Sequence, residues 1–128
     1  MMATVAVGVD VVDVARFTLA LQRRPRLIDR LFTARERDDT AERPERLAAR
    51  FAAKEAVLKA LGSGLGDAHF RSIEVQRQAS GAPLIVLHDE AIALAQSRGV
   101  TQLHVSLSHT ATTATAFVIG SSDEPRAS

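Results

Sequence analysis

The pattern of apolar and polar residues divides the first third of the chain into one strand and a series of helices. Residues 3–12 alternate valine with smaller or polar residues, a period of two that predicts a strand. From Val14 onward the apolar residues recur at helical spacing instead. Pro25 interrupts this helix because proline lacks a backbone donor, and residues 27–31 resume a short one.

A long, alanine-rich helix is the clearest element of the sequence. Thr33 and Glu36 have the spacing of a capping box, so a helix is expected to begin there, and a polar loop should follow over residues 38–44. Residues 47–61 contain no glycine or proline and are rich in alanine, which favours a helix throughout. The glycine-rich run 62–66 is expected to end it.

Strands dominate the second half of the chain. The alternating pattern predicts strands over residues 72–76, 83–87, 103–108 and 115–119, with a turn at 80–82 and one helix between Asp89 and Gly99. Helices thus gather in the first half and strands in the second. This order predicts an α+β fold in which an antiparallel sheet packs against the long Ala-rich helix.

Composition and charge exclude several classes of function. The chain has 128 residues, no cysteine and a formal net charge of +1. Its length suits one domain, which we place at residues 1–120, with a flexible polar tail over residues 121–128. The lack of cysteine excludes thiolate catalysis, and the near-neutral charge argues against a nucleic-acid binder. The N-terminus lacks the features of a signal peptide or membrane span, so a cytoplasmic protein is expected.

Asp10 is an unusual residue for the apolar first strand. Aspartate is depleted in strands, and an ionised carboxylate among valines requires a cation, an arginine or several hydrogen-bond donors nearby. From this residue alone, a capping or salt-bridging role and a metal-binding role both stay open.

The long helix carries four charges although the rest of its surface is apolar. Arg50 and Lys54 flank one edge of its leucine and phenylalanine stripe, and Glu55 and Lys59 flank the other. Because alanine covers most of the remaining surface, the helix is expected to be buried nearly all round. Its charges then need each other or a charged ligand. An ordinary ion pair between Glu55 and Lys59, one turn apart, is the simpler alternative.

Together these charges provide the parts of a magnesium and diphosphate site. Mg²⁺ prefers oxygen ligands and is usually held by one or two carboxylates plus substrate phosphates, and Asp10 and Glu55 can supply the carboxylates. Arg50, Lys54 and Lys59 would neutralise the remaining phosphate charge. Transfer of a phosphorus-centred group asks the protein mainly for positioning and electrostatic stabilisation, which this set can provide.

Three motifs, in order, give the chain a resemblance to a known family. They are Gly8-Val9-Asp10-Val11-Val12-Asp13-Val14 followed by Arg16-Phe17, Arg50-Phe51-Ala52-Ala53-Lys54-Glu55-Ala56-Val57-Leu58-Lys59-Ala60-Leu61-Gly62, and Val105-Ser106-Leu107-Ser108-His109-Thr110. In this order they resemble the signatures of the holo-acyl-carrier-protein synthases, of the 4'-phosphopantetheinyl transferase superfamily. The likeness covers most of residues 5–119. One departure is Ala82, where a lysine often stands in the family.

The resemblance implies an enzyme that transfers the 4'-phosphopantetheine group of coenzyme A to a serine of apo-acyl carrier protein, giving holo-acyl carrier protein and 3',5'-ADP, in fatty acid biosynthesis. It implies that Asp10 and Glu55 are the Mg²⁺ ligands and that Lys59 holds the transferred phosphate, so that these three are the catalytic residues. The residues implied to bind coenzyme A are Arg50, Lys54, Lys59, Gly62, His109 and Thr110. The acceptor of the serine proton stays open between Glu55, His109 and a metal-polarised water.

The resemblance also implies partners and an assembly. Short members of the family are similar to one another in forming trimers, so a homotrimer with active sites between subunits is expected. The acidic carrier protein is expected to dock on the basic first helix through Arg16 and Arg23; a solvated basic face is the alternative. Taken alone, His109 is equally consistent with a structural histidine at a strand end, and Gly62 with a helix terminator.

Three other functions are compatible with parts of the sequence. The same chemistry could serve the carrier domains of polyketide, peptide-synthesis or multienzyme fatty-acid systems. A non-enzymatic trimeric binding domain would predict damage among Asp10, Glu55 and Lys59, and all three are intact. A small nucleic-acid binder would rest on the Arg-rich first helix, and the near-neutral total charge argues against it.

Overall fold

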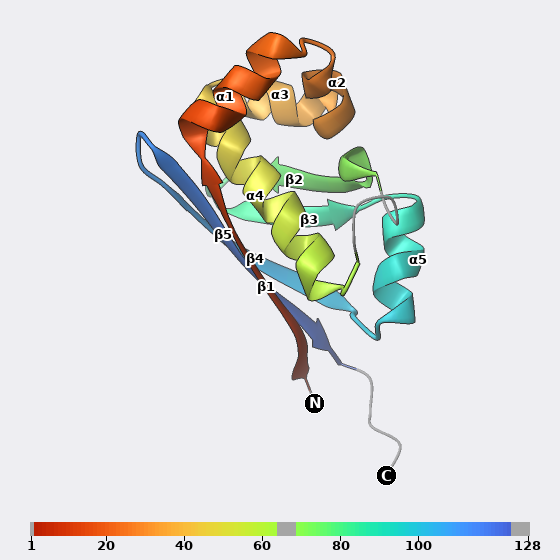
Figure 1. Cartoon of the computed structure of the whole chain (residues 1–128). Coiled ribbons are helices and arrows are strands. Elements are labelled where there is room, and N and C mark those ends of the chain that lie inside the picture. Colours follow the sequence, from red (N-terminus) through yellow and green to blue (C-terminus); the bar gives the residue numbers. More distant parts are fainter. Residues whose placement is uncertain (1, 64–68, 124–128) are drawn as a thin grey trace.

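The computed structural model of the protein describes residues 2–63 and 69–123, which form a mixed succession of helices and strands (Figure 1). In chain order the elements are β1 (Ala3–Asp13), α1 (Val14–Arg23), α2 (Leu27–Leu31), α3 (Ala34–Thr40), α4 (Pro44–Ala60), η1 (Phe70–Ser72), β2 (Ile73–Arg77), β3 (Pro83–Leu87), α5 (Glu90–Ser97), β4 (Gln102–His109) and β5 (Thr113–Ser122). The α+β class predicted from the sequence is confirmed.

The strands form two antiparallel sheets, where the sequence pattern suggested one. The larger sheet has the order β1-β5-β4 and the smaller one pairs β2 with β3. Helix α4 runs across one face of the larger sheet, while α1, α2 and α3 gather at one end of the molecule and α5 lies beside β3 (Figure 1). The first strand therefore lies next to the last one, and α4 lies over both.

Backbone contact between β1 and α4 explains the alanine and glycine in these segments. The α4 residues Ala48, Ala49, Ala52, Ala53 and Ala56 are all buried. A Cβ atom added to Gly8 of β1 would lie 1.9 Å from the carbonyl oxygen of Ala56, so no side chain fits between the two elements at this point. A glycine in a strand interior often marks such a close approach of another backbone. The expectation that α4 is covered nearly all round is confirmed.

Several predicted boundaries shift in the structure. Helix α4 begins at Pro44 rather than at residue 47, because proline is favoured in the first turn, where its missing N–H costs nothing. The expected loop over residues 38–44 is shorter, since α3 runs to Thr40 and the left-handed residues Ala41 and Glu42 make the connection. Asp89 precedes α5 as expected, but its side chain makes no capping hydrogen bond.

The last strand reaches the C-terminal limit that the sequence suggested for the domain. Strand β5 continues through Ser122, with Ser121 buried. The remainder of the predicted tail, residues 124–128, and the run 64–66 of the predicted glycine-rich terminator lie outside the described residues. In the ranges 2–63 and 69–123, none of the helices is both long and apolar enough to cross a membrane.

The face of β1 that points away from α4 is apolar and exposed. Val5, Val7, Val9 and Val11 are between 47% and 64% exposed, and Phe117 on the neighbouring strand β5 is 44% exposed. Valine alternates with residues that face the helix, as the period of a strand requires. A contiguous apolar face on a soluble domain marks a surface for interaction.

The contact at Gly8 predicts that one added methyl group destabilises the protein more at Gly8 than at Gly120. We expect Gly8→Ala to lower the free energy of unfolding by about 3 kcal/mol, because the new Cβ would overlap a helix backbone that cannot move aside locally. Gly120→Ala is the matched control, since the atoms nearest to its added Cβ belong to the side chains of Ala6 and Val100, and it should cost less. Urea unfolding of both variants measures the difference. An equal loss of stability in the two would contradict this account of the packing.

Candidate active site

Asp10 and Lys59 meet where α4 crosses β1. The Lys59 ammonium lies 2.9 Å from Oδ1 of Asp10 and 3.0 Å from the carbonyl oxygen of Val9. The Asp10 side chain is 16% exposed and that of Lys59 is 55% exposed. The alternative of a simple helical pair between Lys59 and Glu55 is therefore not what forms: Lys59 is paired with the strand.

Glu55 shares this site and faces the same carboxylate. Burial raises the pKa of Glu55, the negative charge of Asp10 raises it further, and the positive charge of Lys59 partly opposes both. Two carboxylates are thus held close enough to repel each other, and the single ammonium of Lys59 offsets only part of their negative charge. A divalent cation would relieve this repulsion more completely than one lysine does.

An open pocket of about 450 Å³ surrounds the two carboxylates. Its lining includes Asp10 and Glu55 together with Asp13, Arg16, Phe17 and Phe51. In the described part of the chain no group of three or more His, Cys, Asp or Glu side chains is arranged to hold a metal. Two hard oxygen donors beside open space suit Mg²⁺, which keeps water ligands and accepts substrate oxygens in its remaining positions.

Arg50 and His109 lie in a second pocket, of about 300 Å³. Arg50 is only 8% exposed, and within residues 2–63 and 69–123 its Nε has no hydrogen-bond partner, so a buried donor is left unused. Burial lowers the pKa of Arg50, while the charges of Glu36 and Asp39 act in the opposite direction. Arg46 and Arg77 line the same pocket. Three basic side chains around Arg50, against the single carboxylate of Asp39, make this pocket suitable for an anion, and phosphate in particular.

Arg46 and Arg77 were missed by the sequence interpretation. Arg46 stands one helical turn before Arg50, so the spacing i, i+4 could have pointed to it. Arg77 ends strand β2 and reaches this pocket only through the tertiary fold, and no local pattern signals that.

The two pockets face different sides of α4. Arg50 and Glu55 are five positions apart, which separates their directions by about 140° on a helix. The pockets have no lining residue in common. Within one chain the carboxylate pair and the arginine pocket therefore form two separate surfaces.

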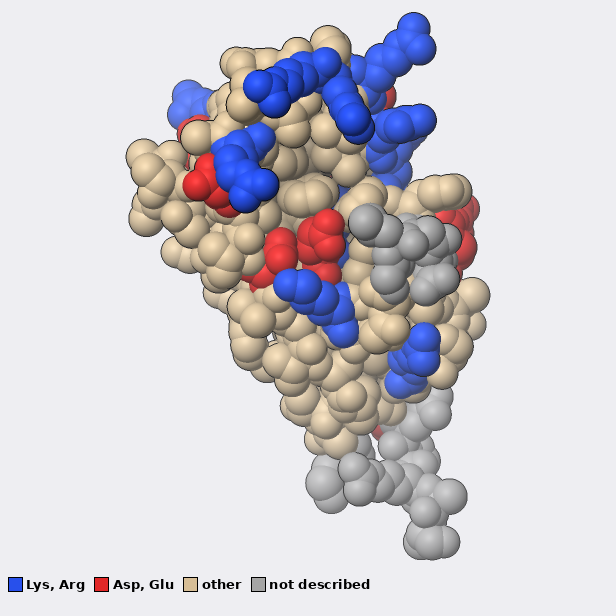
Figure 2. All heavy atoms as spheres, in the orientation of Figure 1, with Lys and Arg blue, Asp and Glu red and all other residues tan. Residues whose placement is uncertain are grey.

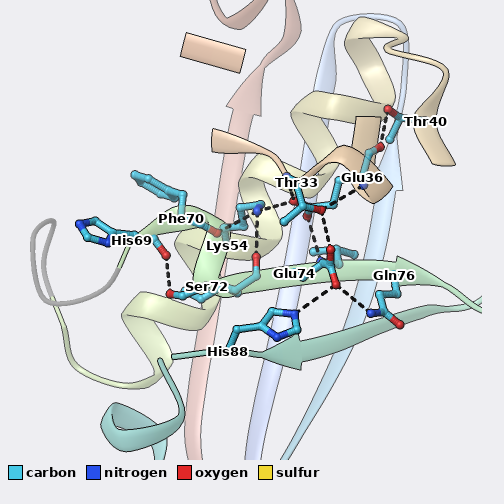
Figure 3. A network of polar contacts seen from close by, with 12 residues as sticks. Thr33, Glu36, Thr40, Lys54, His69, Phe70, Ser72, Glu74, Gln76 and His88 are labelled. Carbon is cyan, nitrogen blue, oxygen red and sulfur yellow. Dashed lines mark hydrogen bonds and ion pairs between the residues drawn. The ribbon is translucent and has the colours of Figure 1, made fainter. Parts of the chain in front are cut away.

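Lys54 does not take the place that the resemblance gave it. Its side chain is completely buried, and Nζ donates to Oε1 of Glu36 at 2.7 Å, to the Phe70 carbonyl at 2.9 Å and to the Ile73 carbonyl at 2.8 Å (Figure 3). All three ammonium donors are thus used by the protein. The expected coenzyme A contact of Lys54 is corrected to a core ion pair, because no surface is left for a ligand to touch.

Glu36 joins this ion pair to the rest of the core. Besides Lys54, its carboxylate accepts the backbone N–H of Thr33 in the predicted capping box and the backbone N–H of Val75 in β2 (Figure 3). A buried carboxylate with three donors is well compensated. The sequence identified Glu36 as a cap but gave no sign that it is also the partner of Lys54.

A second buried carboxylate, Glu74, extends the network toward the surface. Burial acts to raise the pKa of Glu74, but hydrogen bonds from Gln76, Thr33 and His88 outweigh it and lower the pKa below its ordinary range. Figure 3 shows these side chains converging from the residue before α3, from β2 and from the residue after β3. The network fastens the small sheet to α3 and α4.

The other predicted residues occupy the ends of their elements. Gly62 follows α4 with φ of +66°, a left-handed conformation that favours glycine after a helix. Thr110 forms the β4–β5 turn, where its hydroxyl accepts the backbone N–H groups of Thr112 and Thr113. Arg16 lies at the rim of the carboxylate pocket, and Arg23 is exposed in the last turn of α1.

Comparison with known proteins places this arrangement in a family. A family model described as the 4'-phosphopantetheinyl transferase superfamily matches residues 6–117. The chain belongs to this superfamily. It is 50% identical over 115 residues to a holo-[acyl-carrier-protein] synthase from Beutenbergia cavernae, which covers 90% of this chain and 96% of that protein.

Solved structures of holo-acyl-carrier-protein synthases share the fold. Helicobacter pylori holo-[acyl-carrier-protein] synthase in complex with coenzyme A has a TM-score of 0.81 and 30% identity, covering 89% of this chain and 98% of that one. A holo-(acyl-carrier-protein) synthase from Bacillus anthracis, in complex with CoA (3',5'-ADP), has a TM-score of 0.77 and 29% identity, covering 96% and 100%. The fold predicted from the resemblance is confirmed.

The buried pair predicts how the protein responds to loss of the Lys54 charge. We expect Lys54→Met to lower the free energy of unfolding by about 3–5 kcal/mol, because it leaves the Glu36 carboxylate buried without its cation. Urea unfolding measures this loss. Lys59→Met, at a half-exposed site on the same helix, should change stability by less than about 1 kcal/mol.

A double variant separates charge from packing at the same position. Glu36→Gln combined with Lys54→Met removes both charges and should recover part of the stability that Lys54→Met alone loses. If Lys54→Met were as stable as Lys59→Met but bound coenzyme A more weakly, the core assignment of Lys54 would be wrong.

Proposed function

We propose that this protein is an enzyme that transfers the 4'-phosphopantetheine group of coenzyme A to a serine of apo-acyl carrier protein, releasing 3',5'-ADP, in the fatty acid biosynthesis of the cytoplasm. The observation that carries the proposal is the pair of facing carboxylates, Asp10 and Glu55, beside the Lys59 ammonium in an open pocket. Membership of the superfamily and the relatives at up to half identity support the same reaction.

Asp10 and Glu55 are the residues that would hold Mg²⁺. When bound, this ion neutralises the diphosphate of coenzyme A and stabilises the charge that develops during transfer. Side chains of the protein supply the remaining positive charge for the diphosphate. Lys59 stands beside the carboxylates with a flexible, half-exposed ammonium that can reach a phosphate oxygen. Glu55, whose pKa is raised by burial, is one candidate acceptor for the serine proton; His109 and a metal-polarised water are the others.

The arginine pocket would bind the nucleotide end of coenzyme A. The unpaired Nε of the buried Arg50 and the neighbouring His109 offer donors to a phosphate. Gly62 leaves the end of α4 open to a ligand, since no atom of the described part of the chain lies within 4 Å of an added Cβ. Thr110 is placed in the exposed hairpin next to His109. Lys54 has no part in this set.

We further propose that a second copy of the chain completes each site in a homotrimer. The carboxylate pair and the arginine pocket face different sides of α4, so one chain cannot bring both to a single coenzyme A. The exposed valine face of β1, with Phe117, offers the apolar surface on which copies can associate. An active site between subunits then joins the carboxylates of one chain to the arginine pocket of its neighbour.

The acceptor would approach from the side of α1. Lys and Arg side chains gather over α1 and α2 at the top of the molecule in Figure 2. Arg16 lines the carboxylate pocket, and Arg23 follows two turns later on the same helix. Helix α1 therefore carries positive charge next to the site and farther from it. Such a surface is complementary to an acidic carrier protein and would steer it toward the metal.

The reaction is tested by incubating the protein with coenzyme A, Mg²⁺ and apo-acyl carrier protein and following the carrier by mass spectrometry. We expect a mass gain of one phosphopantetheine group that disappears with EDTA. Asp10→Asn and Glu55→Gln should each reduce the rate by at least about 100-fold while circular dichroism stays unchanged. Normal turnover in both variants would refute the carboxylate site. A panel of carrier domains identifies the preferred acceptor.

Mixing two inactive variants tests whether the site is shared between subunits. Asp10→Asn damages only the carboxylate pocket, and Arg50→Gln damages only the arginine pocket. If each site takes one pocket from each of two neighbours, subunits exchanged at equal ratio should regain about a quarter of the wild-type rate. Asp10→Asn mixed with Glu55→Gln is the control and should regain nothing. If neither mixture regains transfer activity, each chain uses its own two pockets.

A further inference from the structure

The Lys59 ammonium binds Asp10, a carboxylate that the proposed function assigns to a metal ion. The ammonium lies 2.9 Å from Oδ1 of Asp10 and is steadied by the carbonyl oxygen of Val9 at 3.0 Å. Val9 lies on β1, an edge strand of the larger sheet, so a carbonyl on its open side can accept a side-chain donor. In this structure the lysine thus holds on to the strand with two contacts.

The charges around Lys59 explain why it turns to the strand rather than along its own helix. Asp10 and Glu55 repel each other, and among the described residues Lys59 supplies the positive charge that acts on Glu55. One ammonium leaves the pair with a net negative charge, whereas a divalent cation would neutralise it. Lys59 and a divalent cation would therefore compete for the Asp10 carboxylate.

We propose that Lys59 is an exchangeable counter-ion of the metal site. In the metal-free protein Lys59 neutralises Asp10 and keeps the two carboxylates together; on metal binding it leaves Asp10, and its freed ammonium becomes available to the diphosphate. The half-exposed, flexible side chain allows this movement, while Asp10 is fixed in the strand. This inference rests on the proposed function. It adds that the phosphate-binding lysine lowers the intrinsic metal affinity of the empty enzyme.

The exchange predicts opposite effects of one substitution on two ligands. Without coenzyme A, Lys59→Met should bind Mn²⁺, a stand-in for Mg²⁺, about twofold to tenfold more tightly than the wild type, because a competing cation is gone. With metal present, the same variant should bind coenzyme A more weakly, because the freed ammonium is missing. Isothermal titration calorimetry at fixed ionic strength measures both affinities without any turnover.

Three controls make the metal titration specific. Lys59→Arg keeps the positive charge and should keep the metal affinity close to that of the wild type. Arg98→Met removes an exposed positive charge directly after α5, one that is not among the charges acting on Glu55, so it should leave metal binding unchanged. Asp10→Asn should abolish the binding that is measured.

The outcomes separate this inference from the proposed function. Tighter Mn²⁺ binding by Lys59→Met, with Lys59→Arg like the wild type, supports the exchange. Metal affinity of Lys59→Met equal to or below that of the wild type overturns it and leaves the metal site standing. Loss of coenzyme A affinity alone would make Lys59 a phosphate contact only. If neither the wild type nor Lys59→Met binds Mn²⁺, the metal site itself is wrong, and the exchange with it.

Discussion

The direct contact of a strand with a helix backbone is the constraint on which the rest of the structure depends. At Gly8 no Cβ fits between β1 and the Ala56 carbonyl, and the buried alanines of α4 keep the helix equally close along its length. Two residues after Gly8 along the strand, Asp10 is thereby brought within reach of side chains from the next turn of the helix. Small residues at the crossing place the carboxylates, and larger ones would move them apart.

Helix α4 distributes its four charges by direction. Lys54 points into the core and pairs with Glu36, Glu55 and Lys59 point toward β1, and Arg50 points to the opposite pocket. Each charge is compensated differently. The core pair is satisfied within the protein, whereas Arg50 keeps an unused donor and the two pocket carboxylates share one lysine. Incomplete compensation is costly to folding and is typical of surfaces that bind ions.

Much of the fold and the composition of the site follow from local patterns in the sequence. The strand over β1, the break at Pro25 and the capping box of Thr33 rest on periodicity and turn chemistry, which act over a few residues. Lys54 could not be assigned this way. An amphipathic helix shows which side is buried, but a helix covered all round gives its charges no such direction, and the partner Glu36 lies 18 residues earlier. Arg77 likewise joins Arg50 only through pairing of distant segments.

The division of the site between two sides of α4 connects chemistry with assembly. Small domains bury a modest share of their surface, and in this chain the carboxylate pocket and the arginine pocket open on different sides of α4. Exposed valines on β1 lie on the same strand as Asp10, so a neighbour that covers them also comes to the edge of the carboxylate pocket. In the proposed trimer, the surface that drives association would therefore also complete the active site. Association and activity would then depend on the same strand, and in a protomer alone the arginine pocket would face away from its own Asp10 and Glu55.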